Sequence, residues 1–503
     1  MKYDVIIGLE IHAELKTKSK MFCACDNQSE GREPNSLVCP VCLGHPGTLP
    51  VPNRQAIEWT VLLGMALGGE INTQSKFDRK NYFYPDLPKG YQISQYDLPL
   101  VRGGQLEIAG RPIAITRVHL EEDTGKLYHP AKSASSLLDF NRAGTPLVEM
   151  VTEPVIADAA EAKKFCQHYQ QILRYLDISN ADMEKGEMRC EANISLQKPA
   201  TWDYRPQEGI VPKKGLRLNA KVEIKNINSF RAVEKAINFE IKRQTDALDS
   251  GEEIKPETRG WNDSRGETYR QRTKETSADY RYFPEPDIPP LVFTPEYLEK
   301  LRTKLIELPL AKSRRFQEQY SFAPADAEII IADRHLADFT ENTMSELRAW
   351  INSTGDNWER QKKKLAKTMA NWLISELFKY LNKDKKSIRE IKITPENFAE
   401  LILLIYQGKV NSTAGQQILA VMYEQSGDPT DIMSDLGLEQ IDDEAALAAI
   451  IQDILKKNEA QADQYRAGKN NVLQYLIGQT MAATKGKANP KIIEKILINL
   501  LKQ

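Results

Sequence analysis

Apolar and polar residues alternate along several short segments of the first 292 residues, and this pattern predicts β-strands with two different faces. The alternating segments are YDVIIGLEIHAEL (3–15), RPIAITRVHLEED (111–123), PLVEMVTEP (146–154), MRCEANISL (188–196) and AKVEIKNIN (220–228). Helical patterns cover 151–178, with an expected start at Thr152 or Glu153 before Pro154, and Phe230 to Ser250. Because strands and helices do not alternate regularly, we expect an α+β domain with an antiparallel sheet.

A proline-rich segment, PEPDIPPLVFTP (284–295), ends this pattern. Beyond it amphipathic helical patterns dominate, such as 295–308 and 365–381. A second break lies between helical patterns near Tyr406 to Val410. We therefore expect three domains: an α+β domain over 1–292, an all-α domain over 293–408 and a small helical tail domain over 409–503.

The composition is that of a folded protein without a global attraction to polyanions. The 503 residues include 27% charged side chains, and 68 basic against 70 acidic residues give a net charge of −2. Acidic residues interrupt the apolar run at the N-terminus, so it does not resemble a secretory signal. No apolar stretch approaches the roughly eighteen residues of a membrane span. The sequence also contains only six cysteines, fewer than a disulfide-rich secreted protein would have. We therefore expect a cytoplasmic protein.

The C-terminal hundred residues are electrically polarised. Residues 431–460 carry eight acids and two bases, whereas 461–503 carry seven bases and two acids. Two solvated helix faces are the simpler interpretation. A phosphate-contacting terminus is the alternative, because Lys485-Gly-Lys-Ala-Asn-Pro490 leads into a helix whose first amides could bind an anion.

Carboxylates and histidines gather on the faces of several predicted strands. Residues two apart in a strand share a face, so Glu10, His12 and Glu14 lie together. The other strands add Arg189, Glu191, Asn193 and Ser195, then Glu223 and Lys225, and then His119, Glu121, Glu122 and Glu149. One interpretation is a solvated face that happens to be acidic. The other is ligation of Mg²⁺ or Mn²⁺ beside substrate phosphates, since carboxylates are poor strand formers.

Four of the six cysteines form two close pairs. Cys23 and Cys25 are separated by one residue, and Cys39 and Cys42 by Pro-Val. Two such pairs joined by a loop can close a tetrahedral zinc site, and we favour structural Zn²⁺ over four buried thiols.

Familiar nucleotide and hydrolase motifs are missing from the sequence. It contains no GxxxxGK[ST] loop, no GxGxxG and no protein-kinase set, so any use of ATP must depend on metals and basic side chains. It also lacks GxSxG and a nucleophilic N-terminal cysteine, so hydrolytic release of ammonia would need another chain.

A set of collinear motifs resembles one family over essentially the whole chain. The motifs are GLEIH (8–12), the segment 23–50 ending CPVCLGHPGTLP, FDRKNYFYPDLPKGYQISQ (77–95), HLEEDTGK (119–126), DFNRAGTPLVEMVTEP (139–154), MRCEANIS (188–195), VEIKNINSF (222–230), YRYFPEPD (280–287) and TKGKANP (484–490). The sequence resembles the B subunit of aspartyl/glutamyl-tRNA amidotransferase, the GatB family.

This resemblance implies an enzyme and its partners. The family uses ATP and Mg²⁺ to phosphorylate the side-chain carboxylate of Glu-tRNA(Gln) or Asp-tRNA(Asn), and ammonia from a glutaminase A subunit then gives Gln-tRNA(Gln) or Asn-tRNA(Asn). A small C subunit completes a heterotrimer. The implied fold is a cradle domain similar to glutamine synthetase and guanido kinases, a helical domain and a YqeY-like tail that binds tRNA.

The resemblance also implies roles for individual residues. Catalytic roles fall to Glu10, His12, Glu122, Glu149 and Glu191, and Mg²⁺ ligation to Glu10, His12, Glu149 and the pair Glu121 and Glu122. Alternation separates that pair onto opposite faces, so one direct ligand is expected, with Glu122 preferred. ATP or substrate contacts fall to Arg79, Lys80, Tyr82, Tyr84, Glu223, Lys225, Asn226 and Arg281, and tRNA contacts to Lys485, Lys487 and Lys491.

Three points stay open at the level of sequence. The aromatic run 82–84 could stack on the terminal adenosine of the tRNA, although a core position is equally consistent with Phe83. The family motif commonly has Asp where this chain has Glu191, which puts direct metal ligation there in doubt. The segment 201–218 looks longer than in the family and has no assigned role. A non-catalytic tRNA-binding scaffold and a free-standing ligase of small carboxylic acids are the competing functions.

Overall fold

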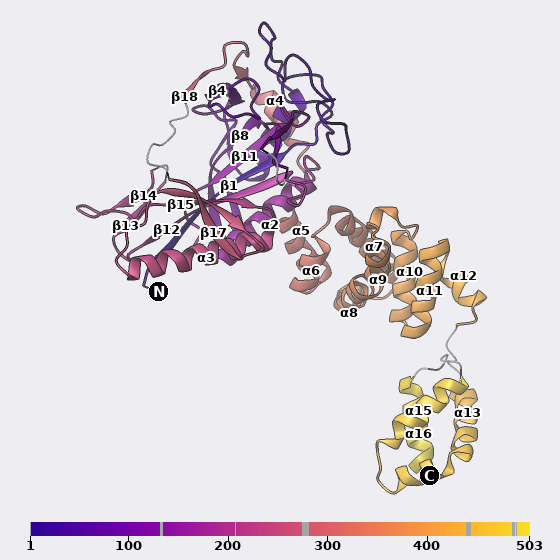
Figure 1. Cartoon of the computed structure of the whole chain (residues 1–503). Coiled ribbons are helices and arrows are strands. Elements are labelled where there is room, and N and C mark those ends of the chain that lie inside the picture. The colour runs from indigo at the N-terminus through magenta and orange to yellow at the C-terminus, as the bar shows by residue number, and fades with distance from the viewer. Residues whose placement is uncertain are drawn as a thin grey trace. The chain divides into compact units, whose positions relative to one another are not determined.

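The computed structural model describes residues 2–130, 134–206, 208–273, 281–438, 444–484, 488 and 490–502. It divides into two compact units, Met1–Leu308 and Pro309–Gln503. The first unit combines a large sheet with helices, and the second is helical (Figure 1). The prediction of an α+β region followed by a helical region is confirmed at this level.

A ten-stranded sheet forms the centre of the first unit. Its strands are β1 (Asp4–Glu14), β2 (Glu70–Ile71), β6 (Val101–Arg102), β7 (Gln105–Ile108), β8 (Arg111–Glu122), β11 (Pro146–Thr152), β12 (Met188–Gln197), β15 (Val222–Ile227), β16 (Glu257–Asn262) and β17 (Glu267–Thr273). They follow the order β17-β16-β15-β12-β1-β11-β8-β6-β2, and β7 pairs with β8. All five alternating segments of the sequence therefore lie in this sheet.

The sheet is mixed, and this corrects the prediction of an antiparallel one. β15 and β16 pair in parallel, with Val222 opposite Glu257, while the other paired strands of the sheet run antiparallel. Helix α3 (Phe230–Asp249) connects these two strands. The helix carries the chain from the end of β15 back to the edge of the sheet at which β15 began, so β16 runs parallel to it.

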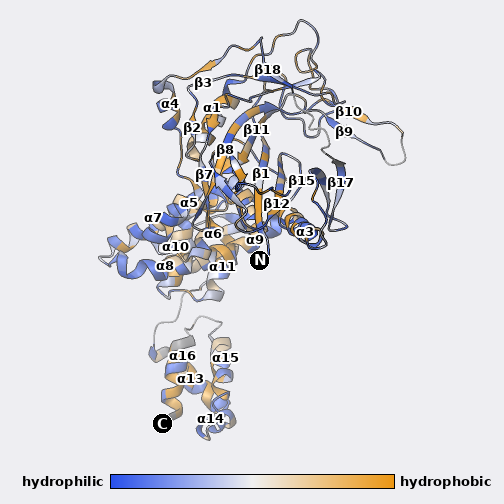
Figure 2. Cartoon of the chain, turned by 90° about the vertical axis from the view of Figure 1, so that its left-hand side faces the viewer, coloured by the Kyte–Doolittle hydropathy of each residue, from blue (hydrophilic) through white to orange (hydrophobic). Residues whose placement is uncertain are grey.

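Three helices cover the apolar face of the sheet. They are α1 (Arg54–Ala66), α2 (Ala159–Tyr175) and α3. Leu9, Ile11 and Leu120 share one hydrophobic core with Phe165 of α2 and Val233 of α3. Because side chains alternate along each strand, this packing directs the polar residues of β1, β8 and β11 to the opposite face. Figure 2 shows hydrophobic and hydrophilic positions mixed along the ribbons of these strands.

Helix α2 begins later than its sequence pattern predicts. β11 continues through Thr152, and Ile156 still forms a bridge with Ile7 of β1. Asp158 caps the helix, because its side chain accepts a hydrogen bond from the Glu161 amide. The start predicted at Thr152 or Glu153 is therefore wrong. The helix predicted from Phe230 to Ser250 is confirmed.

Four small sheets and a fourth helix complete the first unit. The sheets pair β3 (Gln74–Ser75) with β19 (Leu291–Val292), β9 (Lys126–Tyr128) with β10 (Leu137–Asp139) and β13 (Trp202–Arg205) with β14 (Gly209–Pro212), and join β4 (Asp78–Asn81), β5 (Tyr91–Ser94) and β18 (Arg281–Pro284). Helix α4 (Pro295–Arg302) packs on α1, where Tyr297 donates a 2.6 Å hydrogen bond to Glu58. The unit therefore extends past residue 292, where the sequence pattern changes.

The second unit contains helices only among its described elements. They are α5 (Pro309–Arg315) with a π-turn (Phe316–Tyr320), α6 (Pro324–Ile330), α7 (Arg334–Ser353), α8 (Trp358–Asn371) with a second π-turn (Trp372–Leu377), α9 (Phe378–Asp384), a 3-10 turn (Ile388–Glu390), α10 (Pro395–Tyr406), α11 (Ser412–Gln425), α12 (Pro429–Asp435), α13 (Glu444–Lys457), α14 (Glu459–Arg466), α15 (Val472–Ala483) and α16 (Pro490–Lys502). No helix among the described residues is long and apolar enough to cross a membrane.

The helical unit has two separate hydrophobic cores. One includes Phe316 at its start and Met433 near its end, and the break at 406–410 falls inside it because α10 and α11 pack together. The other runs from Leu447 to Leu501 and joins the four helices α13 to α16. The last core thus begins later than residue 409.

Candidate active site

A carboxylate between two imidazoles lies at the centre of the polar sheet face. Strand register places His12 of β1 opposite Glu149 of β11, and Glu149 opposite His119 of β8. One oxygen of Glu149 lies 3.3 Å from Nε2 of His12 and 3.4 Å from Nε2 of His119. The side chain of Glu149 is only 4% exposed. The pairing of three neighbouring strands therefore brings His12, Glu149 and His119 into one row.

Two further carboxylates extend the row. Glu10 lies 3.8 Å from Nε2 of His12, and Glu121 lies 3.3 Å from Nε2 of His119. The five residues, which we call the acidic cluster, form two groups of potential ligands that share Glu149: Glu10, His12 and Glu149, and His119, Glu121 and Glu149. Within each group the ligand atoms lie within 4.8 Å of one another, close enough to surround one cation.

The acidic cluster suits a hard divalent cation. Three carboxylates with two imidazoles form an oxygen-rich donor set of the kind that Mg²⁺ and Mn²⁺ take. Nε2 of His119 faces the carboxylates of Glu121 and Glu149, and its Nδ1 is buried without a hydrogen-bond partner among the described residues. The residues present therefore fit the metal that the sequence motifs imply.

The protonation states reflect the crowding of carboxylates. Burial and the charge of Glu149 raise the pKa of Glu10 to about 7. Burial alone would lower the pKa of His12, but its hydrogen bond to Glu149 and that residue's charge raise it to about 9. Burial would likewise raise the pKa of Glu121, but the charge of Lys80 lowers it to about 2. Without a cation the cluster thus holds protons near neutral pH, and a bound cation would displace them.

Cationic side chains flank the acidic cluster on two sides. Nζ of Lys80 lies 3.5 Å from Glu121, and a guanidinium nitrogen of Arg117 lies 3.6 Å from Glu149. Although burial opposes its charge, the carboxylates Glu121 and Glu149 hold the pKa of Lys80 well above its ordinary value. A permanent positive charge therefore lies beside the predicted metal ligands.

Lys225 and its neighbours continue the face on β12 and β15. Glu191 stands opposite Glu10 in register, and its carboxylate accepts a 2.6 Å hydrogen bond from Lys225. Glu223 lies 3.5 Å from the same ammonium and accepts a 2.7 Å hydrogen bond from Thr258. The neighbouring Asn226 has φ +64° and donates to the hydroxyl of Tyr269. The structure thus brings Glu191, Glu223 and Lys225 beside the acidic cluster.

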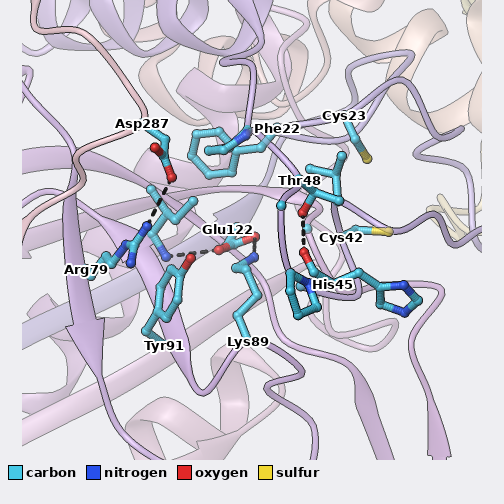
Figure 3. A pocket seen from close by; sticks show the side chains of 17 residues that line it. Phe22, Cys23, Cys42, His45, Thr48, Arg79, Lys89, Tyr91, Glu122 and Asp287 are labelled. Atoms are coloured by element: carbon cyan, nitrogen blue, oxygen red, sulfur yellow. Dashed lines mark hydrogen bonds and ion pairs between the residues drawn. The ribbon is translucent and has the colours of Figure 1, made fainter.

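Glu122 points away from this cluster. Its carboxylate accepts hydrogen bonds of 2.6 Å from Lys89 and 2.9 Å from the Ile93 amide. Together with Cys42 it lines a cavity of about 200 Å³ on the other side of the strand (Figure 3). Glu122, which the sequence analysis preferred, therefore lies outside the two groups of potential ligands, whereas Glu121 belongs to one of them.

Besides Lys80, the FDRKNYFYPD motif supplies Arg79, Tyr82 and Tyr84, and the surroundings of these three side chains differ. Arg79 forms a bidentate pair with Glu285 at 2.7 and 2.8 Å and stacks over Tyr91, so it faces the cavity of Figure 3. Tyr82 donates to Gln92, whereas Tyr84 is exposed.

Phe83 and Arg281 are exposed as well. Phe83 has 92% of its surface accessible, which excludes a core role. Arg281 lies over the ring of Phe283 on the exposed strand β18. Neither position brings these side chains to the acidic cluster.

The four cysteines converge as their spacing predicts. The sulfurs of Cys23, Cys25, Cys39 and Cys42 lie within 4.8 Å of one another. A hydrogen bond from the Cys23 thiol lowers the pKa of Cys42 to about 4. Cys42 is therefore the cysteine of the four that loses its proton most readily. Four sulfurs at this separation match a closed Cys₄ zinc site. Cys166 and Cys190 are buried elsewhere, with their sulfurs 3.5 Å apart.

The structure adds two site residues that the sequence analysis did not assign, and it leaves two predicted residues undescribed. The sequence places His119 on a polar strand face without assigning it as a ligand, although its position two residues before Glu121 gives both the same face. Arg117, two residues earlier still, follows the same rule. The predicted tRNA contacts Lys485 and Lys487 lie outside the described residues, and Lys491 lies in α16.

A large mixed sheet with a carboxylate–histidine centre, followed by a helical region, defines the class to which this chain belongs. Residues 5–299 match the GatB/GatE catalytic domain, and residues 357–501 match the GatB domain that follows it. The chain therefore belongs to the GatB family.

Full-length relatives agree with this assignment. The chain is 44% identical to the B subunit of the aspartyl/glutamyl-tRNA(Asn/Gln) amidotransferase of Thermomicrobium roseum, over 100% of this chain and 99% of the relative. It is 42% identical to the protein of the same name from Persephonella marina, with 100% of both chains covered. It is 41% identical to that of Thermotoga neapolitana, again over 100% and 99%.

Proposed function

We propose that this chain activates the side-chain carboxylate of a glutamate or aspartate esterified to tRNA, as part of a multi-subunit amidotransferase. One carboxylate oxygen attacks the γ-phosphorus of ATP and ADP leaves, which gives an acyl phosphate. Ammonia from a separate glutaminase subunit then attacks the acyl carbon, phosphate leaves and the nitrogen loses a proton. The products are Gln-tRNA(Gln) or Asn-tRNA(Asn). The family assignment and the acidic cluster support this function.

The acidic cluster supplies what phosphoryl transfer requires. Such a transfer depends on charge neutralisation and in-line positioning more than on covalent catalysis. Glu10, His12 and Glu149 would hold one Mg²⁺, and His119 with Glu121 would complete a second position beside the shared Glu149. When bound, the metal neutralises the phosphate oxygens.

The neighbouring side chains have roles that follow from their charge. Lys80 and Lys225 keep their protons and bring positive charge to the phosphates or to the acyl phosphate. Glu191 holds Lys225 in place, so we assign it a positioning role rather than metal ligation. This agrees with the longer Glu side chain at a position where the family commonly has Asp.

The observation that carries the proposal is the single carboxylate of Glu149 between two imidazoles. His12→Ala should abolish ATP hydrolysis stimulated by mischarged tRNA and leave tRNA binding intact. Glu234→Ala is the matched control, because Glu234 is a helix carboxylate whose partner is Lys163. Activity is measured as phosphate release by the assembled enzyme. Full activity of the His12 variant would contradict the catalytic role of the acidic cluster.

Zinc is proposed as a structural element of the cysteine cluster. Metal analysis should find about one equivalent of Zn²⁺ per chain, since four thiolates complete its coordination. Cys39→Ala should lose this metal, whereas Cys166→Ala, at a buried thiol outside the cluster, should retain it. A folded, metal-free wild-type protein would contradict the assignment.

The basic C-terminus is proposed to contact the phosphates of the tRNA. Replacing Lys485, Lys487 and Lys491 by Gln should weaken tRNA binding and reduce the slope of log affinity against log salt by about one per lysine. An unchanged slope would show that these lysines are only part of a solvated surface.

A further inference from the structure

A buried lysine lies beside the cysteine cluster. Lys20 follows β1 and is 0% exposed. Its Nζ lies 2.7 Å from the carbonyl oxygen of Leu37, 3.4 Å from that of Phe140 and 3.9 Å from Sγ of Cys42. An ammonium group has three N–H donors, so these contacts use all of them. The two carbonyl groups are neutral, and only the sulfur of the three acceptors can carry a negative charge.

A second buried lysine among the described residues balances its charge with carboxylates. Lys312 of α5 is 6% exposed, donates a 2.5 Å hydrogen bond to Asp338 and lies 3.2 Å from Glu341. Lys20 has no such carboxylate partner among the described residues. Because a buried charge without an opposite charge is costly, Lys20 requires another source of negative charge.

The carboxylate that lies nearby on β8 already has its own partners. A Cβ atom placed on Gly144 would lie 3.5 Å from Cδ of Lys20 and 3.9 Å from Oε2 of Glu122, so both side chains pass the same glycine. Glu122, however, accepts its hydrogen bonds from Lys89 and from the Ile93 amide. Among the described residues, the cysteine cluster is therefore the source of negative charge that remains for Lys20.

The sulfur of Cys42 receives the donors that a thiolate requires. The Cys39 amide donates to it at 3.1 Å, and Nζ of Lys20 approaches it from another segment. Hydrogen bonds of this kind favour the charged form of a cysteine and orient it as a metal ligand. In a complete Cys₄ site a bound Zn²⁺ balances only two of the four thiolate charges. The cluster would therefore still be negative beside Lys20.

We propose that Lys20 is the charge partner of the cysteine cluster: its ammonium group donates to the Cys42 thiolate and balances part of the negative charge that zinc leaves. This rests on the proposed zinc site. Lys20 is a positioning residue and not a ligand. Its two carbonyl contacts also join the loop between the cysteine pairs, at Leu37, to the loop after β10, at Phe140. The charge and the packing of the zinc site therefore depend on one side chain.

The first test measures how tightly the full chain holds zinc in competition with a chelator. Lys20→Met keeps the length of the side chain but removes its charge, and the dissociation constant for Zn²⁺ should rise about 10- to 100-fold. Lys20→Gln keeps an N–H donor without the charge and should lose zinc in the same way. Lys18→Met, at an exposed lysine of the same segment, is the matched control and should bind zinc like wild type. Wild-type zinc affinity in Lys20→Met or in Lys20→Gln would overturn the role of charge.

The second test separates charge balance from simple packing. With zinc bound, Lys20→Met should unfold at a lower temperature than wild type. After zinc has been removed by a chelator, this difference should vanish or change sign, because protonated thiols leave the ammonium group without an opposite charge. An equal loss of stability with and without zinc would show that Lys20 only packs the loops, and would overturn the proposal.

The third test reads the sulfur directly by replacing Zn²⁺ with Co²⁺. A hydrogen bond to a thiolate lowers the energy of its lone pairs, so the thiolate-to-metal charge-transfer band should move to longer wavelength in Lys20→Met and stay in place in Lys18→Met. An unshifted band in a Lys20→Met protein that binds Co²⁺ would overturn the contact with Cys42. A wild-type protein that binds neither metal would instead contradict the proposed zinc site, and the role of Lys20 with it.

Discussion

The ten-stranded sheet carries two groups of buried charged residues that differ in how their charges are balanced. One is the acidic cluster on β1, β8 and β11. The other, which we call the arginine network, joins α3, β16 and β17 and consists of Glu240, Arg243, Glu257, Arg259 and Arg270. Both contain nearly inaccessible carboxylates, so burial alone does not tell them apart.

The arginine network satisfies its own carboxylates. Glu240 accepts hydrogen bonds of 2.6 and 2.9 Å from Arg243 and another from Gln244. Glu257 accepts 2.9 Å from Arg259 and 2.6 Å from Arg270. Three guanidinium groups thus serve two carboxylates, and nothing further is required to keep them ionised. Such a network is typical of a structural element.

The acidic cluster does not balance its charges in this way. Its carboxylates meet imidazoles at 3.3 to 3.8 Å and Lys80 at 3.5 Å, whereas each carboxylate of the arginine network accepts guanidinium hydrogen bonds of 2.6 and 2.9 Å. The pKa of Glu10 rises to about 7 through burial and the charge of Glu149. A buried acid is therefore a functional candidate when its neighbours do not supply enough positive charge and hydrogen bonds to keep it ionised.

The strongest test exchanges the central carboxylate of the acidic cluster. Glu149→Gln preserves size but removes the charge that both ligand groups share, so ATP turnover stimulated by mischarged tRNA should fall by about a thousandfold. The fold should survive, because the amide has the size of the carboxylate, and Glu10 and Glu121 still face the two imidazoles. Phosphate release and a denaturation curve for the same preparation check both statements. A variant that is inactive because it is unfolded would not support the comparison.

The equivalent exchange in the arginine network should give the opposite result. Glu257→Gln leaves three guanidinium groups without a full set of acceptors, and breaking a buried pair in this way costs about 3 kcal/mol of unfolding free energy. Turnover of the folded protein should stay close to that of wild type. If Glu257→Gln instead lost activity at full stability, the distinction between the two groups would be wrong.

The sequence predicted which residues share a strand face, but not how strands pair. Period-two alternation placed Glu10 with His12 and separated Glu121 from Glu122, and both statements hold in the structure. The choice between the last two depends on the pairing of β8 with β11, which puts His119 opposite Glu149. That register is set by contacts distant in sequence, so the local pattern could not supply it.

The remaining differences between prediction and structure also have physical explanations. The parallel pairing of β15 and β16 depends on the crossover helix between them, and the helix from Phe230 was predicted without that consequence. The start of α2 could have been found, because Asp158 followed by Glu161 is the signature of an N-terminal cap. The four cysteines could be assigned from spacing because short loops leave little freedom in how they meet.

Added metal should distinguish the two groups by its effect on stability. A ligand that binds only the folded state adds about 2.7 kcal/mol when present at a hundred times its dissociation constant. Mg²⁺ should therefore raise the unfolding midpoint of the wild type and of Glu257→Gln, but not that of Glu149→Gln. Sodium chloride at equal ionic strength is the control. An equal rise in all three proteins would mean that the ion acts elsewhere.

The smallest expected effect is the pH dependence of the arginine network. Burial would raise the pKa of Glu257, but Arg270 and Arg259 hold it below its ordinary value of 4.5. A carboxyl with a lowered folded-state pKa stabilises the fold above its unfolded-state pKa, and this stability is lost as the pH falls through the folded-state value. One such group changes the unfolding free energy by at most about 1.4 kcal/mol per pH unit.

The measurement compares the unfolding free energies of wild type and Glu257→Gln, taken from urea midpoints. The gap between these two free energies should be constant from pH 7 to about 5 and should narrow below 4.5. Glu234→Gln removes a partly exposed carboxylate from its pair with Lys163 and should change the stability far less than Glu257→Gln. A gap for Glu257→Gln that widens in acid would show that its carboxyl is not held ionised by the arginines.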